Sequence, residues 1–214
     1  MPQEIDFDKE IKFLAIAENL KTEMRHSWLS DGRHESVAEH TWRLSLMVLR
    51  YAHQLDQPVD VLKCLKIAIV HDLPEAIAGD IPVMEAQTSE AKKRKEQAEL
   101  EGMTRIKDLL GDGNGEELFE IWMDYERQDS YESKFVKALD KLEVFIQHNE
   151  APIETWEYGE KEMMFQDKWL RKYCAFDSFL NAFANRVTED SLNKLKAAGE
   201  DLEAIKKTAL EKAA

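Results

Sequence analysis

Apolar residues recur every three or four positions along almost the whole chain, whereas the alternating runs typical of strands are scarce. This spacing puts apolar side chains on one face of an α-helix. Residues 8–24 form one such pattern, which includes Phe13, Leu20 and Met24. The spacing therefore predicts an all-α fold in which helices bury their apolar faces against one another.

A helix boundary is indicated near Ser36. The stretch 27–36 is polar, and its Asp31-Gly32 pair predicts a turn. Ser36 and Glu39 then form a capping box, in which each side chain satisfies a backbone amide that the helix leaves free. We expect a helix from this cap to about Leu55.

A second boundary follows Asp60, which is expected to cap a helix over residues 61–72. Pro74 interrupts this pattern, because proline lacks an amide donor and clashes with the preceding turn. It suits the first position of a new, short helix, which we expect to end at residues 79–82. The chain is therefore predicted to bend just after Asp72.

The remaining chain shows helical patterns separated by loops. Residues 85–110 are rich in Lys, Glu and Ala, which is typical of a surface helix, and GDGNG at 111–115 predicts a loop without a phosphate-binding motif. We expect one domain over residues 1–188 and a peripheral helical extension over residues 189–214. Further helices are expected at about 116–127, 131–149 and 167–187.

Charge and composition limit the partners and the location. The formal net charge is −14, which disfavours binding to a nucleic-acid polymer, because such binding needs many Lys and Arg side chains. Cys64 and Cys174 lie in separate apolar patterns, so we expect free thiols. The sequence shows neither a signal-peptide pattern nor the roughly 18 consecutive apolar residues of a membrane span, so we expect a cytoplasmic protein without membrane contacts.

His40 lies on the apolar face of its predicted helix. Leu44, Met47, Val48 and Tyr51 follow it at i+4, i+7, i+8 and i+11. A buried histidine in this setting either binds a metal or simply forms a hydrogen bond to a backbone carbonyl.

His71 and Asp72 continue the apolar face of the helix expected over residues 61–72. Adjacent helical positions differ by about 100°, so both side chains can face one cavity. Aspartate is rarely buried unless it is paired or bound to a metal. The alternative is that Asp72 caps the next helix by accepting donors near Glu75.

Asp140 also lies on an apolar face, with Val136 and Val144 one turn away on either side. A carboxylate there needs a cation. A salt bridge to Lys137 is the alternative, but such a pair contributes only a few tenths of a kcal/mol on an exposed helix.

One shared divalent ion accounts for all four residues, since the alternatives require four polar side chains to point inward from three helices by coincidence. Nitrogen and oxygen ligands suit Mn, Co, Ni, Fe or Zn more than Ca or Mg. Such an ion lowers the pKa of a bound water from about 15.7 toward about 7, and the resulting hydroxide can attack phosphorus. The expected ligands are His40, His71, Asp72 and Asp140.

These ligands resemble the H…HD…D motif of the HD-domain metal-dependent phosphohydrolases. The resemblance covers roughly residues 10–185 and is similar in detail to the 5′-deoxynucleotidase branch. It implies a helical HD-domain bundle that removes phosphate from nucleoside 5′-monophosphates, prefers deoxyribose and is often a dimer. The strings that carry it are RHESVAEH at 33–40, HDLPEAIAGDIP at 71–82 and KFVKALDKLE at 134–143.

The resemblance also implies catalytic and substrate contacts. It places Glu75 with Asp72 at the reacting centre, where a carboxylate can transfer protons; an exposed glutamate favoured by the helix dipole is the alternative. Asp80 matches a position that contacts the sugar, or it simply begins the next turn.

The segment before His40 corresponds to the region where the family gathers phosphate and nucleoside contacts. Arg25 and Arg33 suit phosphate through paired donors, and Trp28 offers a face to a base. A surface arginine and a core tryptophan are the alternatives, and the spacing Arg-His-Ser-Trp departs from the adjacent Arg-Trp of some members. We assign no chemistry to the remaining histidines or to Lys137, for which a solvated position is expected. These histidines are His26, His34, His53 and His148.

We predict an enzyme that hydrolyses (deoxy)nucleoside 5′-monophosphates to nucleoside and phosphate by attack of a metal-bound hydroxide. Arg33 and Arg25 would hold the phosphate and Glu75 would handle protons. Diphosphohydrolase or cyclic-nucleotide phosphodiesterase activity is the alternative among enzymes. A non-catalytic metal-binding regulatory protein is the alternative of another class, although such a protein needs no proton-transfer residue.

Overall fold

The computed structural model describes residues 5–82, 88–111 and 113–212 of the chain. In these residues it consists of helices and one two-stranded antiparallel sheet, so the predicted helical fold is confirmed. With η denoting 3₁₀ helices, the elements are α1 Phe7–Ala17, η1 Glu18–Lys21, β1 Met24–Trp28, β2 His34–Ser36, α2 Val37–Tyr51, η2 Ala52–Gln54, α3 Val61–Val70, α4 Glu75–Ala78, α5 Ser89–Leu110, α6 Asn114–Arg127, α7 Tyr131–Glu150, η3 Ile153–Thr155, α8 Tyr158–Met163, α9 Arg171–Cys174, α10 Ser178–Ala197 and α11 Leu202–Glu211.

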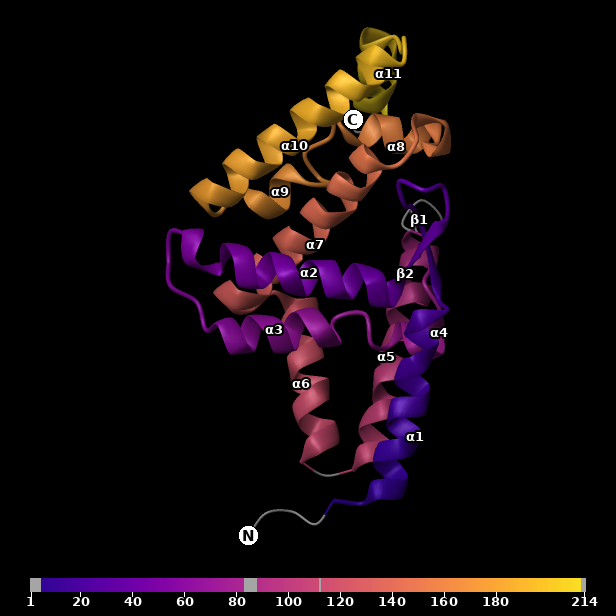
Figure 1. The fold of residues 1–214 in the computed structure, drawn as a ribbon, viewed down its shortest axis with the longest axis vertical. Helices are drawn as coiled ribbons and strands as arrows, with labels where there is room; N and C mark the ends of the chain where they lie inside the picture. Colours follow the sequence, from indigo (N-terminus) through magenta and orange to yellow (C-terminus); the bar gives the residue numbers. More distant parts are fainter. Residues whose placement is uncertain (1–4, 83–87, 112, 213–214) are drawn as a thin grey trace.

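Helix α7 passes through the middle of the elongated molecule, and the other helices pack on it or beyond its ends (Figure 1). Helices α2 and α3 lie side by side against α7, and α10 packs on its far half. Apolar side chains of these four helices form the larger core, which includes Leu44, Ile67, Leu139 and Leu180. A second core joins η1, α4, α5 and α6 and includes Met103, Ile106 and Trp122. None of the helices in the described ranges has the length and apolar character needed to cross a membrane.

The predicted cap of α2 is confirmed. The Ser36 side chain accepts the Glu39 amide, and the Glu39 carboxylate accepts the Ser36 amide. Helix α2 therefore begins at Val37, and His40 lies in its first turn on the face buried against α7.

The bend between α3 and α4 also follows the predicted signals. Asp60 caps α3, which ends at Val70, and Gly79 ends α4 with a positive φ of 78°. Pro74 stands at the N-cap of α4. A Cβ atom added to Gly102 of α5 would lie 2.8 Å from the Pro74 carbonyl oxygen, so glycine is required there for α5 to pack this closely on α4.

The prediction of a single helix over residues 8–24 is wrong. Helix α1 ends at Ala17, a 3₁₀ turn follows, and Met24 already belongs to β1. The polar stretch 27–36 contains the end of β1 and all of β2. These two strands form a hairpin, because their backbone amides and carbonyls pair with one another. Their polar side chains hide the alternating pattern by which strands are usually predicted. The predicted turn at Asp31-Gly32 is present, with Gly32 donating to the Leu29 carbonyl.

The prediction of one helix over residues 167–187 is also wrong, because α9 ends at Cys174 and α10 begins at Ser178. The Asp177 side chain caps α10 by accepting the Leu180 amide and also accepts the Tyr131 hydroxyl. A cap residue fixes a new helix start, so α9 and α10 are separate.

Other predicted bounds differ by a few residues. Helix α5 begins at Ser89, and residues 85–87 of its expected range lie outside the described residues. The last residues of the loop expected at 111–115 already belong to α6. Residue 188, the expected domain end, lies within α10, and the tail continues as α11, where Lys212 binds Glu162 of α8.

Candidate metal centre

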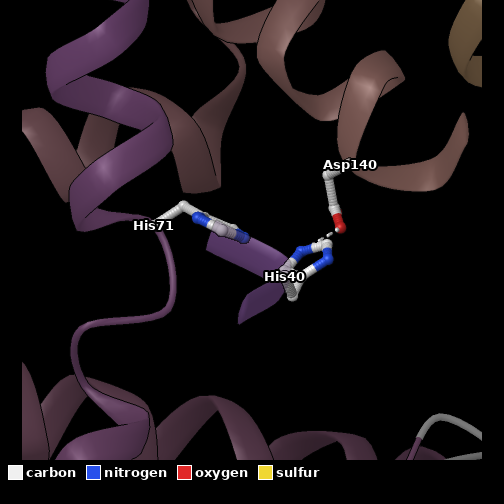
Figure 2. A group of neighbouring side chains, drawn as sticks. All are labelled: His40, His71 and Asp140. Atoms are coloured by element: carbon white, nitrogen blue, oxygen red, sulfur yellow. Dashed lines mark ion pairs between the residues drawn. The ribbon is translucent and has the colours of Figure 1, made fainter. Parts of the chain in front are cut away.

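Three polar side chains from distant segments converge in the interior. His40 comes from α2, His71 from the end of α3 and Asp140 from the middle of α7. A ligand atom from each lies within 4.8 Å of the others, and all three residues are buried. Figure 2 shows the two rings and the carboxylate facing a common point.

A hydrogen bond to Glu143 fixes the orientation of the His40 ring. Its Nδ1 lies 2.5 Å from Oε2 of Glu143, which is fully buried, and the other Glu143 oxygen accepts Nε of Arg43 at 2.7 Å. A carboxylate only accepts, so the proton of His40 lies on Nδ1. In the neutral ring, which is the form that binds a metal, Nε2 therefore carries a lone pair, and it has no hydrogen-bond partner among the described residues.

His71 is held in the same way. Its Nδ1 donates to the Ala68 carbonyl at 2.8 Å, which leaves Nε2 as a second buried lone pair without a hydrogen-bond partner in the described chain. Two imidazoles therefore present acceptor atoms toward one centre, as histidine ligands of metals do.

Asp140 faces His40 with one oxygen, since Oδ1 lies 3.3 Å from the His40 Nε2. Its Oδ2 accepts the Tyr125 hydroxyl at 2.7 Å and lies 3.1 Å from the Lys141 ammonium. Burial raises the pKa of Asp140, but Lys141 and His40 outweigh burial and hold it well below its ordinary value. The alternative pairing with Lys137 is wrong, because the Lys137 ammonium lies instead over the Tyr125 ring, 4.0 Å from its centre.

Asp72 completes the group from the bend between α3 and α4. Its Oδ2 lies 3.0 Å from the His71 Nε2 and 3.8 Å from the His40 Nε2, and it accepts Nη1 of Arg25 at 3.2 Å. Burial raises the pKa of Asp72, but His71 and Arg25 outweigh burial and lower it. The alternative role as a helix cap is wrong, because no side chain caps α4.

The donor set fits a divalent cation. Two buried lone pairs face two carboxylates, so acceptor meets acceptor, and this arrangement is unfavourable without a positive charge between them. Without a cation, a proton on His40 Nε2 meets the same demand: burial and Arg25 lower the pKa of His40, but Glu143 and Asp140 outweigh both and raise it to about 10.

A cavity of about 510 Å³ opens in front of this group. Of the residues singled out in the sequence, Arg25, His71, Asp72, Glu75, Asp80 and Asp140 line it. Glu75 is only 4% exposed, and its Oε2 has no hydrogen-bond partner among the described residues. Burial, with the Asp72 and Asp80 carboxylates, raises the pKa of Glu75 to about 9, so this carboxyl group keeps its proton at neutral pH. The alternative of an exposed helix-start glutamate is wrong.

Trp28 and Arg33 lie outside the cavity in the described structure. Trp28 stacks on His34 with ring centres 3.8 Å apart. Arg33 is half exposed, and its guanidinium donates to both Glu39 oxygens, so it supports the cap of α2. The expected phosphate contact of Arg33 therefore has no support in the geometry.

Several residues that line the cavity or support the proposed metal ligands were missed in the sequence. Lys137 is half-buried and lines the cavity, contrary to the expected solvated position. Glu143 follows Asp140 by one turn on a face that also carries Leu139 and Leu142, so the reasoning used for Asp140 applied to it as well. The others carried no sequence signal, because their positions depend on tertiary packing. They are Lys95, Tyr125, Lys141, His148 and Glu160.

Comparison with known proteins gives matches over most of the chain. The HD domain matches residues 17–189. A Danio rerio protein named 5′-deoxynucleotidase HDDC2 is 37% identical over 145 residues, which cover 67% of this chain and 70% of the relative. The human protein of the same name is 36% identical over 142 residues, covering 65% and 67% of the two chains.

A solved structure shares the fold. It is described as a predicted metal-dependent phosphohydrolase from Magnetospirillum magnetotacticum MS-1 and superposes with a TM-score of 0.73 at 23% identity, covering 88% of this chain and 96% of the other.

Proposed function

The chain belongs to the HD-domain family, and from this premise we propose that it is a divalent-metal-dependent phosphomonoesterase that hydrolyses (deoxy)nucleoside 5′-monophosphates to nucleoside and phosphate. Its relatives named 5′-deoxynucleotidase support this substrate class. The observation that carries the proposal is the buried pair of imidazole lone pairs facing two carboxylates beside a cavity.

We propose His40, His71, Asp72 and Asp140 as the ligands of one divalent ion, with Mn, Co, Ni, Fe and Zn as the candidates. When bound, such an ion supplies Lewis-acid chemistry, because it offsets phosphate charge and acidifies water.

Arg25 is the proposed phosphate-binding residue. It lines the cavity, its Nη1 holds Asp72, and its Nε lies 3.4 Å from Oε2 of the buried Glu35. A guanidinium held in this position offers donors to a phosphate oxygen while it orients a metal ligand. The half-buried lysines of the same cavity, Lys95, Lys137 and Lys141, add positive charge around the phosphate.

Glu75 is the proposed general acid. In the reaction the oxygen of water bonds to phosphorus, the bond from phosphorus to the nucleoside 5′-oxygen breaks, and the Glu75 proton passes to that oxygen. The proton that the attacking water loses passes through solvent to the Glu75 carboxylate and restores the acid. A carboxyl group that is protonated at neutral pH suits this role. Asp80 lines the cavity beside Glu75 and is the proposed sugar contact.

Phosphate release tests the proposal. Protein treated with a chelator and then given Mn or Co should release inorganic phosphate, and no pyrophosphate, from dAMP. His71→Ala should lower this rate by at least about 100-fold, because several kcal/mol of charge stabilisation is lost. His53→Ala, which changes an exposed histidine outside the cavity, should match the parent. Full activity of His71→Ala would refute the metal centre.

We also propose a homodimer. Large apolar side chains lie exposed on the neighbouring helices α2 and α3, which lie side by side, and a second copy would cover them. They include Trp42, Leu46, Leu49, Leu62 and Ile69. Light scattering should give twice the chain mass for the parent, and Leu46→Glu should give the monomer mass. The expected cytoplasmic location stays a prediction.

A further inference from the structure

A second polar cluster lines the same cavity, away from the metal centre. It consists of His26 of β1, His148 near the end of α7 and Glu160 of α8. Glu160 Oε1 lies 3.3 Å from the His148 Nε2 and 3.5 Å from the His26 Nε2. Glu160 and His148 are 3% and 5% exposed, so both are well shielded from solvent.

This cluster leaves hydrogen-bonding groups unused. His148 Nδ1 is buried without a hydrogen-bond partner among the described residues, and His26 Nε2 lies 3.5 Å from both the Glu157 and Glu160 carboxylates without a hydrogen bond to either. Glu160 Oε2 accepts the Glu157 amide at the start of α8, so Oε1 is the oxygen that meets the two rings. Buried polar groups in proteins are almost always paired, so these atoms indicate a place for a polar ligand.

Helix α7 sets the spacing between the cluster and the metal centre. Asp140, Val144 and His148 follow one another at four-residue intervals and all line the cavity. Eight residues of α-helix span about 12 Å. Val144 lies between Asp140 and His148 on this face of α7, and Phe145, Met163 and Trp169 also line the cavity.

The cavity therefore changes character along its length. One end has the proposed metal ligands and cations, the α7 residue between is the apolar Val144, and the far end has a carboxylate beside two imidazoles. A nucleotide has the matching order, since a charged phosphate is followed by a base with apolar faces and a polar edge of donors and acceptors.

We propose that His26, His148 and Glu160 bind the edge of the nucleobase and so select nucleotides over simpler sugar phosphates. This inference rests on the proposed phosphomonoesterase activity. Glu160 accepts from a base N–H, and an imidazole N–H donates to a base nitrogen or carbonyl oxygen.

The test compares a substrate that has a base with one that lacks it. The parent should hydrolyse dAMP and dGMP with a higher kcat/KM than 2-deoxyribose 5-phosphate. Glu160→Gln and His26→Ala should each lower kcat/KM on the nucleotides on the order of tenfold, which is the value of about one hydrogen bond. Their kcat/KM on the sugar phosphate should fall less than twofold.

Glu162→Gln is the matched control. Glu162 is a buried acid on the same helix, but it binds Lys212 and does not line the cavity. This variant should leave the ratio of the two kcat/KM values at the parent value. If the variants at 26 and 160 lower both substrates equally, or if Glu162→Gln changes the ratio as they do, the cluster only braces α8 and the inference is wrong.

The outcomes also separate the two proposals. A parent that hydrolyses neither substrate refutes the phosphomonoesterase function. A parent that hydrolyses both substrates with the same kcat/KM keeps that function and refutes base recognition.

Discussion

The two ends of the cavity are built differently. At the proposed metal centre three of the proposed ligands have a partner behind them: Glu143 behind His40, the Ala68 carbonyl behind His71 and Tyr125 behind Asp140. Arg25 binds Oδ2 of Asp72, the oxygen that faces the two rings. At the far end, the closest contacts of Glu160 Oε1 to the two rings are 3.3 and 3.5 Å, and the His148 Nδ1 has no partner in the described structure.

This difference teaches what each end requires. A metal site needs its ligand atoms fixed before the ion arrives, and supporting hydrogen bonds provide that order. A site that accepts one face of a small molecule tolerates looser contacts, because the ligand supplies the missing partners. Variants at the metal centre should therefore have larger effects than variants at the far end.

The largest effect is expected for Asp140→Asn. The change removes one ligand charge and should lower metal-dependent phosphate release by about 10³-fold or more, since several kcal/mol of stabilisation depends on the ion. Metal content after dialysis should fall in parallel. Asp129→Asn changes an exposed aspartate and should retain both properties. An active Asp140→Asn protein with full metal content would remove the distinction between the two ends.

Glu75→Gln should separate catalysis from metal binding. Because the parent carboxyl group is protonated at neutral pH, glutamine replaces it with little change in charge, and metal affinity should stay within about twofold. The rate should fall about 10²- to 10⁴-fold, which is the usual contribution of an acid–base group.

The pH profile gives a second reading of Glu75. Its pKa is raised to about 9, so the proton is present below that pH and is lost above it. The parent kcat should therefore fall as pH rises through about 9, and the residual kcat of Glu75→Gln should lack this decline. Identical profiles for the two proteins would contradict the assigned role.

The fold was predictable where local signals decide the structure. The Ser36 capping box, the Asp60 cap and Pro74 act through neighbours in sequence, and each produced the expected boundary. The β1–β2 hairpin was missed, because its strands are short and polar and are stabilised by pairing rather than by an apolar pattern. The break before Asp177 was missed because the apolar pattern continues across it.

The metal centre was more predictable than the rest of the cavity. His40 and Asp140 interrupt apolar helical faces, which is visible in the sequence, and the structure brings them together. His26, His148 and Glu160 come from three elements whose relative positions depend on packing between helices, so no sequence pattern joins them. For Arg33 the sequence suggested a phosphate contact that the geometry does not support. Its guanidinium instead pairs locally with Glu39.

Glu143→Gln should weaken the metal centre without removing a proposed ligand. The amide is a poorer acceptor for the His40 Nδ1 proton and for Arg43, so the ring loses part of its orientation. Loss of such a supporting group typically costs about 10- to 100-fold in metal affinity, and titration calorimetry with Mn or Co should show this. Glu150→Gln removes the exposed second partner of Arg43 and should change the affinity less than about twofold. Equal effects of the two variants would mean that Glu143 only anchors Arg43.

The smallest effect is expected at the far end, for the stability of Glu160→Gln. Burial raises the pKa of Glu160, but the His148 hydrogen bond outweighs burial. The pKa of Glu160 therefore lies below its ordinary value of about 4.3. The folded state therefore gains stability from the ionised carboxylate above that ordinary value and loses it as pH falls through the lowered pKa. Urea unfolding should show Glu160→Gln about 1 kcal/mol less stable than the parent at pH 7, with the difference vanishing in acid. Glu154→Gln, at an exposed position, should match the parent at every pH. A difference that stays constant down to acid pH would mean that packing, rather than the charge on Glu160, stabilises this end of the cavity.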